Sequence, residues 1–187
     1  VVLSIVEQQE SDTELSCPIY LFQGLPKGDK MEWIIQKCVE LGVHAIVPVA
    51  TKRAVVKLDE KKAQKKVNRW NAIAESAAKQ SGRGIVPVVL AVTKCKAELE
   101  YARQLDVKMI PYEKAAGINA TKQLIGSVSF GQSVGIFIGP EGGFEEAEVE
   151  AAKAMGAVPV TLGKRILRTE TAGMTILSIL MYHLERE

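Results

Sequence analysis

The sequence predicts an α/β protein in which a parallel β-sheet is flanked by helices. Short apolar runs alternate about six times with longer amphipathic segments along the chain. Because these runs are nearly continuous rather than alternating with polar residues, they indicate strands covered on both faces, as in parallel sheets. With 187 residues and 47% hydrophobic content, the chain is long enough for one well-packed domain.

The predicted strands are short apolar runs bounded by glycine, proline and polar residues. The first is ended by Gly24 and Pro26, and Gly42 separates the second from the preceding helix. In chain order the predicted strands are Pro18–Phe22, Ala45–Val49, Val86–Val92, Val107–Tyr112, Ser133–Ile138 and Val158–Leu162.

The predicted helices begin at capping residues and carry apolar side chains at helical spacing. Asp29 caps the first, where Met31, Ile34, Ile35, Cys38 and Val39 form the apolar face, and Asp59 caps the second. The later helices are expected at Lys94–Gln104, Lys114–Ile125, Glu145–Met155 and Thr171–Glu185, after a second helix that runs from Asp59 to about Lys79.

The composition favours a protein of the reducing cytoplasm. Gly173–Leu184, the longest apolar stretch, is too short to cross a membrane, so no membrane partner is expected. Cys17, Cys38 and Cys95 are widely spaced and form no Cys-x-x-Cys pair, which argues against disulfides and against a zinc site. The start at Val1 has no features of a secretion signal and suggests a fragment of a longer chain.

Positive charge is concentrated in one part of the sequence. Between Lys52 and Arg83 there are ten Lys or Arg residues against three Asp or Glu, although the net charge of the whole chain is only +2. From Gly139 to Glu187 the balance reverses, with eight acidic against five basic residues. A solvated helix face is the simplest explanation of such a lysine run, but here Arg53, Lys57 and the loop around Arg83 extend it, which favours contact with a phosphate backbone.

The run Ile138–Phe144, Ile-Gly-Pro-Glu-Gly-Gly-Phe, lies where a predicted strand ends and a helix begins. Its three glycines allow the backbone to approach a ligand closely. It matches neither the dinucleotide-binding nor the phosphate-loop pattern, and Glu141 would repel phosphates. A tight connecting turn and a site for a neutral or cationic ligand are both open interpretations of this run.

The run Leu162–Gly173 is too polar for a simple connection between a strand and a helix. Lys164, Arg165 and Arg168 fall within five residues and are followed by two threonines and Glu170. A solvated helix entry capped by a threonine is the alternative. Since ligands of parallel sheets bind beyond the carboxyl ends of the strands, two such loops are expected to face one crevice.

Four motifs give the chain a resemblance to a known family. They are Leu25–Glu32, Gln80–Arg83, Ile138–Phe144 and Leu162–Gly173, and they occur in this order in the RsmE family. Members of that family are SPOUT-class methyltransferases that use S-adenosylmethionine to methylate N3 of a uridine in small-subunit (16S) ribosomal RNA. The resemblance extends from about Pro18 to the end of the chain.

The resemblance implies a particular architecture. Residues 18–187 would form a SPOUT methyltransferase domain with a C-terminal trefoil knot, an exception to the rule that chains are not threaded. Residues 1–17 would be the tail of a PUA-like RNA-binding domain plus a linker. The family further implies a homodimer, and ribosomal RNA or the small ribosomal subunit as the partner.

The resemblance also implies a distribution of roles among the residues. S-adenosylmethionine presents an activated methyl group, so alignment with the uridine nitrogen and removal of its proton are the main tasks. Catalytic roles are expected for Arg83, Glu113, Glu141 and Arg168, with Glu113 or Glu141 as the base. Cofactor contacts are expected from Tyr112, Glu113, Ile138, Gly139, Pro140, Glu141, Gly142, Leu162, Gly163, Arg165, Ile166, Leu167, Thr171 and Ala172. RNA contacts are expected from Lys52, Arg53, Lys61, Lys65, Arg69 and Arg83, and no metal is expected.

Two other functional classes fit parts of the sequence. A small-molecule enzyme with a nucleotide-type cofactor would explain the two strand-end loops but not the basic segment. A non-catalytic RNA-binding module would explain the basic segment but not the paired loops. Calorimetry with S-adenosylmethionine and the salt dependence of RNA binding would separate the three classes.

Overall fold

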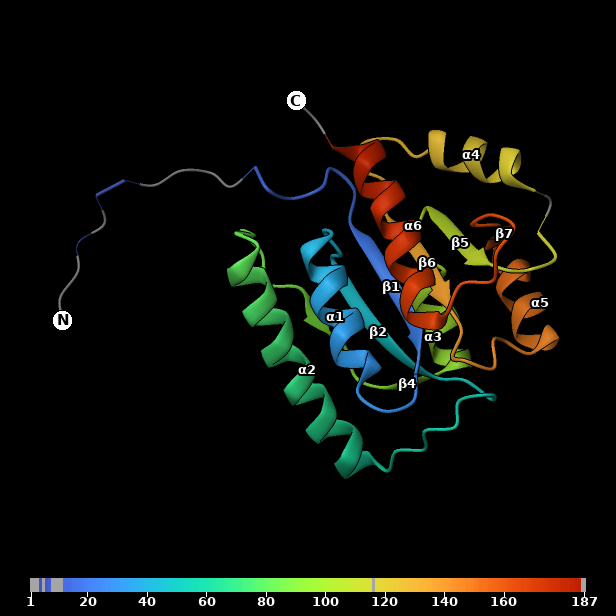
Figure 1. Cartoon of the computed structure of the whole chain (residues 1–187), viewed down its shortest axis with the longest axis horizontal. Coiled ribbons are helices and arrows are strands. Elements are labelled where there is room, and N and C mark those ends of the chain that lie inside the picture. Colours follow the sequence, from blue (N-terminus) through green and yellow to red (C-terminus); the bar gives the residue numbers. More distant parts are fainter. Residues whose placement is uncertain (1–3, 5, 8–11, 116, 186–187) are drawn as a thin grey trace.

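A parallel sheet lies between two layers of helices in the computed structural model, which describes residues 4, 6–7, 12–115 and 117–185 (Figure 1). Much of residues 1–17, the expected tail of a PUA-like domain plus a linker, falls outside the described residues. In chain order the elements are β1 (Ile19–Gly24), α1 (Lys30–Glu40), β2 (Ala45–Ala50), α2 (Glu60–Gln80), β3 (Val88–Val89), β4 (Thr93–Lys94), α3 (Cys95–Ala102), β5 (Val107–Pro111), α4 (Ile118–Gly126), β6 (Val134–Ile138), α5 (Glu146–Ala154), β7 (Val158–Val160) and α6 (Thr169–Leu184).

The predicted fold class is confirmed, because each recorded strand pair in the described part of the chain is parallel. The strand order is β3-β2-β1-β6-β5-β7, and β4 pairs with the far end of β2. The chain therefore builds outward from β1 to one edge and then forms β5 on the other side. It next places β6 between β1 and β5 and adds β7 outside β5. The strand order reverses between β1 and β6, and ligands of such sheets bind beyond the carboxyl ends of the strands near a reversal of this kind.

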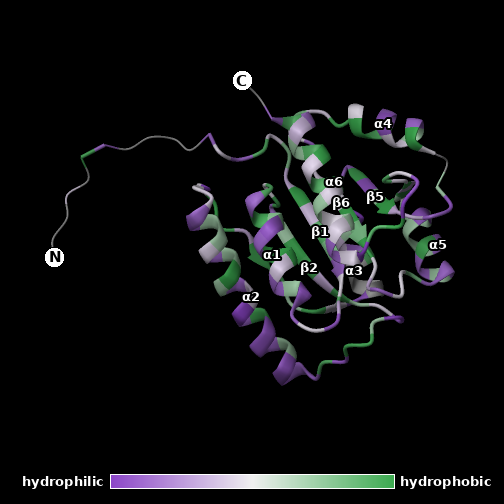
Figure 2. Ribbon diagram, viewed as in Figure 1, coloured by the Kyte–Doolittle hydropathy of each residue, from purple (hydrophilic) through white to green (hydrophobic). Residues whose placement is uncertain are grey.

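Successive residues of β1 face two separate cores. Ile19 and Leu21 pack with α1, α2 and α6, whereas Phe22 packs on the other face, where its ring stacks on Phe137 at 4.6 Å between centroids. Because neighbouring side chains of a strand point to opposite faces, continuous apolar strands are what a doubly covered sheet requires. The apolar strands lie between the two helical layers in Figure 2.

The edge of the sheet differs from the sequence prediction. The strand expected at Val86–Val92 is shortened to β3, and a further short strand, β4, follows at Thr93–Lys94, where the next helix was expected to begin. Ala45 pairs with Val88 but Val49 pairs with Thr93, so the edge strand contains one residue more than β2 between these points. Pro48 lies in this stretch of β2 and has no N–H group to donate to a neighbouring strand. An extra, unpaired residue in the edge strand is therefore tolerated opposite Pro48.

Two helix boundaries also differ from prediction. The helix expected from Lys114 begins only at Ile118, since Gly117 has φ 109°, outside the helical region. The last helix begins at Thr169 instead of Thr171, and its N-cap residue is Arg168, whose side chain makes no capping bond. The five apolar residues predicted for the first helix are all buried in α1.

Helix α6 returns from the β7 edge of the sheet to pack against α1, which lies beyond the centre (Figure 1). Residues 161–168 therefore cross from the end of β7 toward the carboxyl ends of β6 and β1. The crossing brings the predicted Leu162–Gly173 loop near the reversal of strand order between β1 and β6. Among the described residues, no helix has the length and apolar content needed to span a membrane.

Candidate functional site

A cavity of about 740 Å³ lies at the carboxyl ends of β5, β6 and β7. Its volume is in the range of small-molecule and cofactor sites. The residues after the ends of β6 and β7 supply most of its surface. The lining residues are Lys30, Arg53, Pro111, Tyr112, Glu113, Ile138–Phe144, Val160–Thr169 and Ala172.

The loop after β6 forms one wall and is folded tightly on itself. A Cβ atom on Gly139 would lie 3.0 Å from the Cα and C atoms of Gly143, and one on Gly24 would lie 2.6 Å from the ring of Pro140. Gly143 adopts φ 64°, which favours glycine. The glycines that the sequence placed here are therefore required by the path of the chain, which brings backbone rather than side chains to the cavity.

The residues between β7 and α6 form the opposite wall. Gly163 adopts φ 117°, and Thr161 bonds to it on both sides, with Oγ1 donating to its carbonyl at 3.2 Å and accepting its N–H at 3.3 Å. Leu167 is half-buried against the core beneath α6, whereas the side chain of Ile166 is 91% exposed. This wall thus offers apolar side chains together with the cations Lys164, Arg165 and Arg168.

Tyr112 and Glu113 follow β5 and border the cavity between the two walls. The backbone N–H of Tyr112 donates to the carbonyl of Val160 at 2.9 Å, which continues the pairing of β5 with β7. Glu113 is exposed, so its carboxylate is free to meet a ligand at the mouth of the cavity.

Glu141 is engaged by the loop that follows β1. Its carboxylate accepts a hydrogen bond from the backbone N–H of Lys27 at 3.1 Å and pairs with Lys30 Nζ at 2.9 Å. Burial alone would raise the pKa of Glu141, but the hydrogen bond and charge of Lys30, with the Lys27 N–H, lower it. Lys30 also lies 3.4 Å from Glu170 at the start of α6. Lys30, which pairs with both carboxylates, therefore joins the loop after β6 to the start of α6.

Arg53 connects the loop after β2 to the first wall. Its Nη1 donates to the carbonyl of Gly142 at 3.1 Å, and its Cβ lies 3.2 Å from where a Cβ on Gly142 would be. The neighbouring Lys52 pairs with Glu145 at 3.2 Å, at the start of α5. Lys52 and Arg53, two of the residues predicted to contact RNA, thus lie beside the cavity, and Arg53 lines it.

Most of the predicted site residues come together in this cavity. Thirteen of the fourteen residues expected to contact the cofactor line the cavity. The exception is Thr171, which lies within α6, where its carbonyl accepts a hydrogen bond from Thr175 Oγ1 at 2.8 Å. Among the expected catalytic residues, Glu113, Glu141 and Arg168 line the cavity. No group of three or more His, Cys, Asp and Glu residues suited to a metal ion occurs among the described residues.

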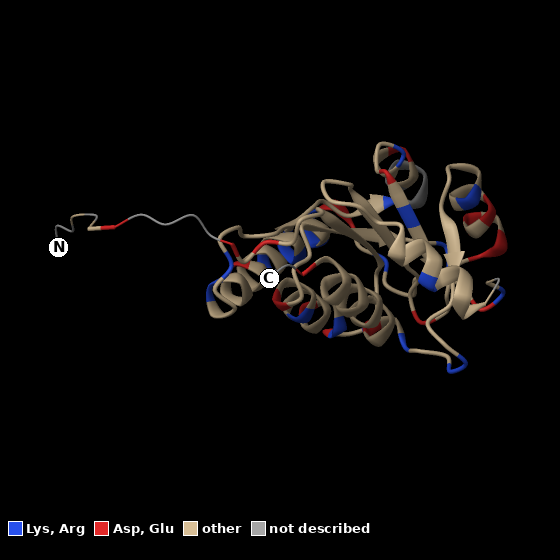
Figure 3. Cartoon of the chain, turned by 90° about the horizontal axis from the view of Figure 1, so that it is seen from above, with Lys and Arg blue, Asp and Glu red and all other residues tan. Residues whose placement is uncertain are grey.

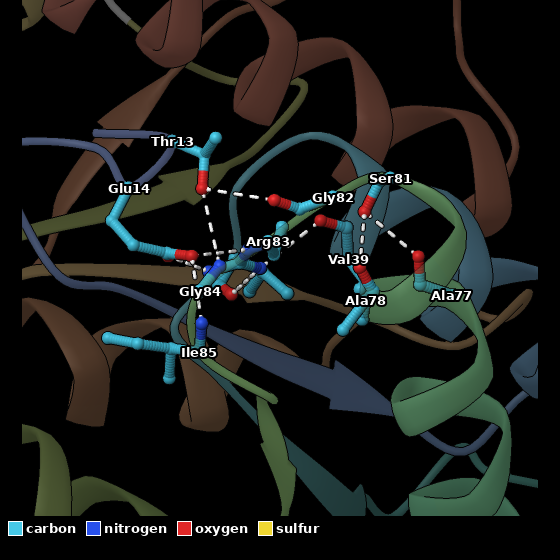
Figure 4. Close-up of polar contacts among 11 residues, drawn as sticks. Thr13, Glu14, Val39, Ala77, Ala78, Ser81, Gly82, Arg83, Gly84 and Ile85 are labelled. Carbon is cyan, nitrogen blue, oxygen red and sulfur yellow. Dashed lines mark hydrogen bonds and ion pairs between the residues drawn. The ribbon is translucent and has the colours of Figure 1, made fainter. Parts of the chain in front are cut away.

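Arg83 is the exception among the expected catalytic residues, since it lies outside the cavity. Its side chain is 4% exposed, and Nη1 donates to the carbonyls of Val39 and Val43 at 3.1 and 2.7 Å (Figure 4). The rest of the guanidinium is paired with Glu14. With its donors occupied by the protein, Arg83 supports the fold in this structure, and we propose no catalytic or RNA-binding role for it.

The basic helix α2 is less free than its composition suggests. Lys61 and Lys65 are exposed, but Arg69 pairs with Glu32 of α1 at 2.7 Å. Trp70 is buried in the core, with Lys66 Nζ 5.9 Å from its ring centroid. Basic and acidic residues occur together on several helices (Figure 3), so local pairing reduces the charge available to a partner.

Three residues at the site were not identified from the sequence: Gln23, Lys30 and Thr169. Lys30 lies in the Leu25–Glu32 motif, but only the fold brings it to Glu141. Thr169 was considered only as a helix cap, yet its Oγ1 donates to the carbonyl of Gly139 at 2.6 Å. Gln23 had one detectable signal, because it is a polar residue at the end of an apolar strand.

Comparison with known proteins identifies the family. A family model described as an RNA methyltransferase domain matches residues 13–181. The ribosomal RNA small subunit methyltransferase E of Bacillus subtilis is 45% identical over 97% of this chain and 72% of its own length. The protein of the same name from Mesomycoplasma hyopneumoniae is 36% identical over 93% of this chain and 74% of its own length.

Solved structures extend the comparison to the fold. A putative methyltransferase from Legionella pneumophila, in complex with S-adenosylmethionine, aligns with a TM-score of 0.85 and 34% identity, over 93% of this chain and 69% of that one. The small subunit methyltransferase E of Neisseria gonorrhoeae, also bound to S-adenosylmethionine, has a TM-score of 0.79 and 37% identity over 91% and 68% of the two chains. A SpoU methyltransferase at 15% identity shares the fold alone, with a TM-score of 0.54. The chain therefore belongs to the ribosomal RNA small subunit methyltransferase E family, and its fold is that of the SPOUT methyltransferases.

Proposed function

We propose that this protein transfers a methyl group from S-adenosylmethionine to N3 of a uridine in 16S ribosomal RNA. The observation that carries the proposal is the cavity that the loops after β6 and β7 form at the carboxyl ends of β5, β6 and β7. Family membership gives the reaction class and the ribosomal RNA substrate. Two related structures with the cofactor support S-adenosylmethionine as the methyl donor.

The walls of the cavity fit this cofactor chemically. Gly139, Gly142 and Gly163 keep side chains away from the backbone, so that peptide groups can bond to a ligand. Ile138, Leu162 and Leu167 offer apolar surface for a nucleobase. When bound, S-adenosylmethionine supplies a methyl group on a positively charged sulfur, which is already activated for transfer.

The chain must also deal with the proton on N3 of the uridine. Glu113 is exposed at the mouth of the cavity, and we propose it as the general base. Glu141 is a weaker candidate, because Lys30 and the Lys27 N–H occupy its oxygens and lower its pKa. Its proposed role is to hold the first wall in place.

Negative charge develops on the uracil carbonyl oxygens as the N3 proton leaves. Five cations line the cavity against two carboxylates, namely Lys30, Arg53, Lys164, Arg165 and Arg168 against Glu113 and Glu141. With Lys30 paired to Glu141 and Arg53 bonded to Gly142, the second wall supplies the freest cations. We propose that Arg168 stabilises this charge and that Arg165 contacts RNA or a partner subunit.

The proposed RNA path extends from the cavity along the loop after β2 to the exposed lysines of α2. Lys52, Arg53, Lys61 and Lys65 lie on this path, and their contacts would be to phosphates rather than bases. Arg69 remains a candidate, since its pair with Glu32 is two-thirds exposed on the arginine side and is therefore readily exchanged for a phosphate.

The quaternary structure and the knot are part of the same proposal. The outer face of α6 presents Ile179 and Tyr182, which are 41% and 86% exposed, and an apolar surface of this kind suits a homodimer. The crossing of residues 161–168 from β7 to α6 is compatible with a trefoil knot. We further propose that residues 1–17 are the tail of a PUA-like domain and a linker, and that the protein acts in the cytoplasm, where its ribosomal substrate lies.

The proposal is tested by incubating the protein with S-adenosylmethionine and small ribosomal subunits that lack the modification. Mass spectrometry of the digested RNA is expected to show 3-methyluridine at a single position. Methyl transfer to another atom would refute the N3 assignment, and cofactor binding without transfer would favour a different substrate. Absence of cofactor binding at millimolar concentration would favour the non-catalytic RNA-binding module.

A further inference from the structure

Gln23 is a polar side chain buried where the sheet pattern calls for an apolar one. Ile19 and Leu21 face the helices α1 and α6, and Gln23 continues the same side of β1 with no exposed surface. A buried amide is compatible with a stable core only when its hydrogen-bonding groups have partners. The contacts of Gln23 therefore indicate what the residue does.

The amide of Gln23 begins a short chain of buried hydrogen bonds. Its Nε2 donates to Thr169 Oγ1 at 2.9 Å and to the carbonyl of Gly24 at 3.0 Å. Thr169 Oγ1 in turn donates to the carbonyl of Gly139 at 2.6 Å. Because Thr169 Oγ1 accepts from Gln23 while it donates to Gly139, the two bonds strengthen each other in this low-dielectric setting.

This chain of bonds joins both walls of the cavity. Gly139 lies at the base of the first wall and Thr169 at the end of the second, 30 residues away, and both line the cavity. Gln23 does not line it but holds Thr169 from the side of the sheet. The carbonyl of Gly139 is thereby directed to Thr169.

One atom of Gln23 has no partner. Oε1 is buried and accepts no recorded hydrogen bond, and it lies 3.7 Å from where a Cβ on Gly173 would be. An apolar side chain of similar size would avoid this unsatisfied acceptor. The amide is thus a poor choice for packing alone, whereas it is well suited to hold the hydroxyl of Thr169.

We propose that Gln23 is a positioning residue for the cofactor: through Thr169 it fixes the Gly139 peptide and with it the spacing of the two cavity walls. The effect on the cofactor rests on the proposed function, but the effect on the walls does not. Gln23 and Thr169 keep the backbone groups of the first wall in the arrangement that binds the ligand, so that little ordering is required when it enters.

The test compares Gln23→Leu, Thr169→Val and Thr169→Ser in the ligand-free protein and with S-adenosylmethionine. Hydrogen exchange of peptides covering residues 139–144 is expected to be at least fivefold faster in Gln23→Leu and Thr169→Val. Thr169→Ser keeps the hydroxyl and should match the wild type. By calorimetry, Kd for S-adenosylmethionine should rise about tenfold in the first two variants only.

Val67→Ala on α2 is the matched control, because Val67 is buried in the same core but lies away from the cavity. It should lower the melting temperature and leave Kd and exchange in residues 139–144 unchanged. Gln23→Leu removes an unsatisfied acceptor, so its melting temperature should be at least that of Val67→Ala.

Wild-type exchange of residues 139–144 in Thr169→Val, or equal losses of cofactor affinity in Thr169→Val and Thr169→Ser, would overturn the inference. If Gln23→Leu fails to fold, the Thr169 pair decides alone. Failure of the wild-type protein to bind the cofactor would refute the proposed function while leaving the exchange test intact.

Discussion

Arg83 and Glu14 form an ion pair that joins the segment before β1 to the loop after helix α2. The side chain of Arg83 is 4% exposed and that of Glu14 is 22% exposed. Glu14 also accepts the backbone N–H of Ile85 at 3.2 Å, and the adjacent Thr13 donates to the carbonyl of Gly82 at 3.4 Å (Figure 4). Two consecutive residues thus hold the segment that enters β1 against the loop after α2.

The same guanidinium also donates hydrogen bonds to backbone carbonyls at the end of α1. The carbonyl of Val39 belongs to the last turn of that helix and that of Val43 to the turn that follows, and both accept from Arg83. Carbonyl groups at a helix end have no partner within the helix, so a cation there is favourable in both hydrogen bonding and charge. Arg83 therefore connects α1, α2 and the entering chain.

We expect Glu14→Ala to destabilise the domain by about 3 kcal/mol, because it leaves a buried guanidinium without its counter-ion. Glu75→Ala is the matched control: Glu75 pairs with Lys79 one turn away, but both side chains are more than half exposed. That change should cost less than about 1 kcal/mol. Urea unfolding followed by circular dichroism measures both. Equal losses in the two variants would show that the Arg83 pair has no special weight.

The contribution of Glu14 should depend on pH with a defined sign. Burial alone would raise its pKa, but the hydrogen bond and charge of Arg83 outweigh burial and lower it below the usual value. A carboxyl with a lowered pKa in the folded state stabilises the fold fully above its unfolded pKa, and this stabilisation is lost as the pH falls through the folded pKa.

The difference in unfolding free energy between wild type and Glu14→Ala should accordingly be constant from pH 7 to about pH 5 and shrink below about pH 4. Urea titrations at these pH values provide the measurement. A difference that grows on acidification would contradict the assignment of Glu14 as the charged partner of Arg83.

Arg83 also shows where reasoning from the sequence ends. Its motif, Gln80–Arg83, marked it as functional, and a lone arginine in a glycine-containing loop gives no sign of being buried. Its partner Glu14 is 69 residues away, in a polar stretch that resembles an ordinary linker. Local patterns cannot predict a pair of this separation, because only the folded chain brings the segment before β1 to the loop after α2.

The cavity was more predictable, because its walls are continuous in the sequence. The runs Ile138–Phe144 and Leu162–Gly173 each carry their own glycines and polar residues, and the rule for parallel sheets places strand-end loops together. What could not be predicted is how the walls are held, because Lys30, Gln23 and Thr169 make their contacts with residues that are far away in the sequence. The late start of α4 also could not be predicted, because the positive φ of Gly117 is a property of the folded backbone.

The two candidate bases should separate in kinetics. Glu113→Gln is expected to lower kcat at least 100-fold, since loss of a general base costs about two to four orders of magnitude. Glu141→Gln removes the charge that faces Lys30 and should mainly raise Kd for S-adenosylmethionine, with kcat within about tenfold of wild type. Single-turnover methyl transfer to small subunits, at saturating cofactor, is the measurement. A larger loss of kcat in Glu141→Gln than in Glu113→Gln would reverse the assignment.

The exposed lysines of α2 should report on phosphate contact. Lys61→Gln and Lys65→Gln together are expected to weaken RNA binding and reduce the slope of log K against log salt by about 1 to 2, because each contact releases a counterion. Lys79→Gln at the other end of the helix is the control, since it already pairs with Glu75 at 2.6 Å. Fluorescence anisotropy with a fragment of the substrate RNA over a salt series measures the slopes. An unchanged slope in the double variant would exclude this face from the RNA path.

Gly139→Ala tests whether the first wall must be folded as tightly as the structure has it. The added Cβ would lie 3.0 Å from backbone atoms of Gly143, which cannot move like the end of a flexible side chain. The loop must then open, and Thr169 loses the carbonyl that it holds, so Kd for S-adenosylmethionine should rise at least tenfold. Gly126→Ala is the control: a Cβ there meets nothing within 4 Å, and alanine favours the helix α4 to which Gly126 belongs.

The two glycine variants should therefore differ in their effect on Kd for S-adenosylmethionine. Gly126→Ala is expected to leave Kd unchanged and to keep or raise the melting temperature by a small amount, because alanine lowers the entropy of the unfolded chain. Calorimetry and thermal unfolding of both variants give the comparison. If Gly139→Ala binds the cofactor like the wild type, the close approach of Gly139 to Gly143 is not what shapes the cavity, and the polar contacts of Thr169 and Glu141 must hold the wall without it.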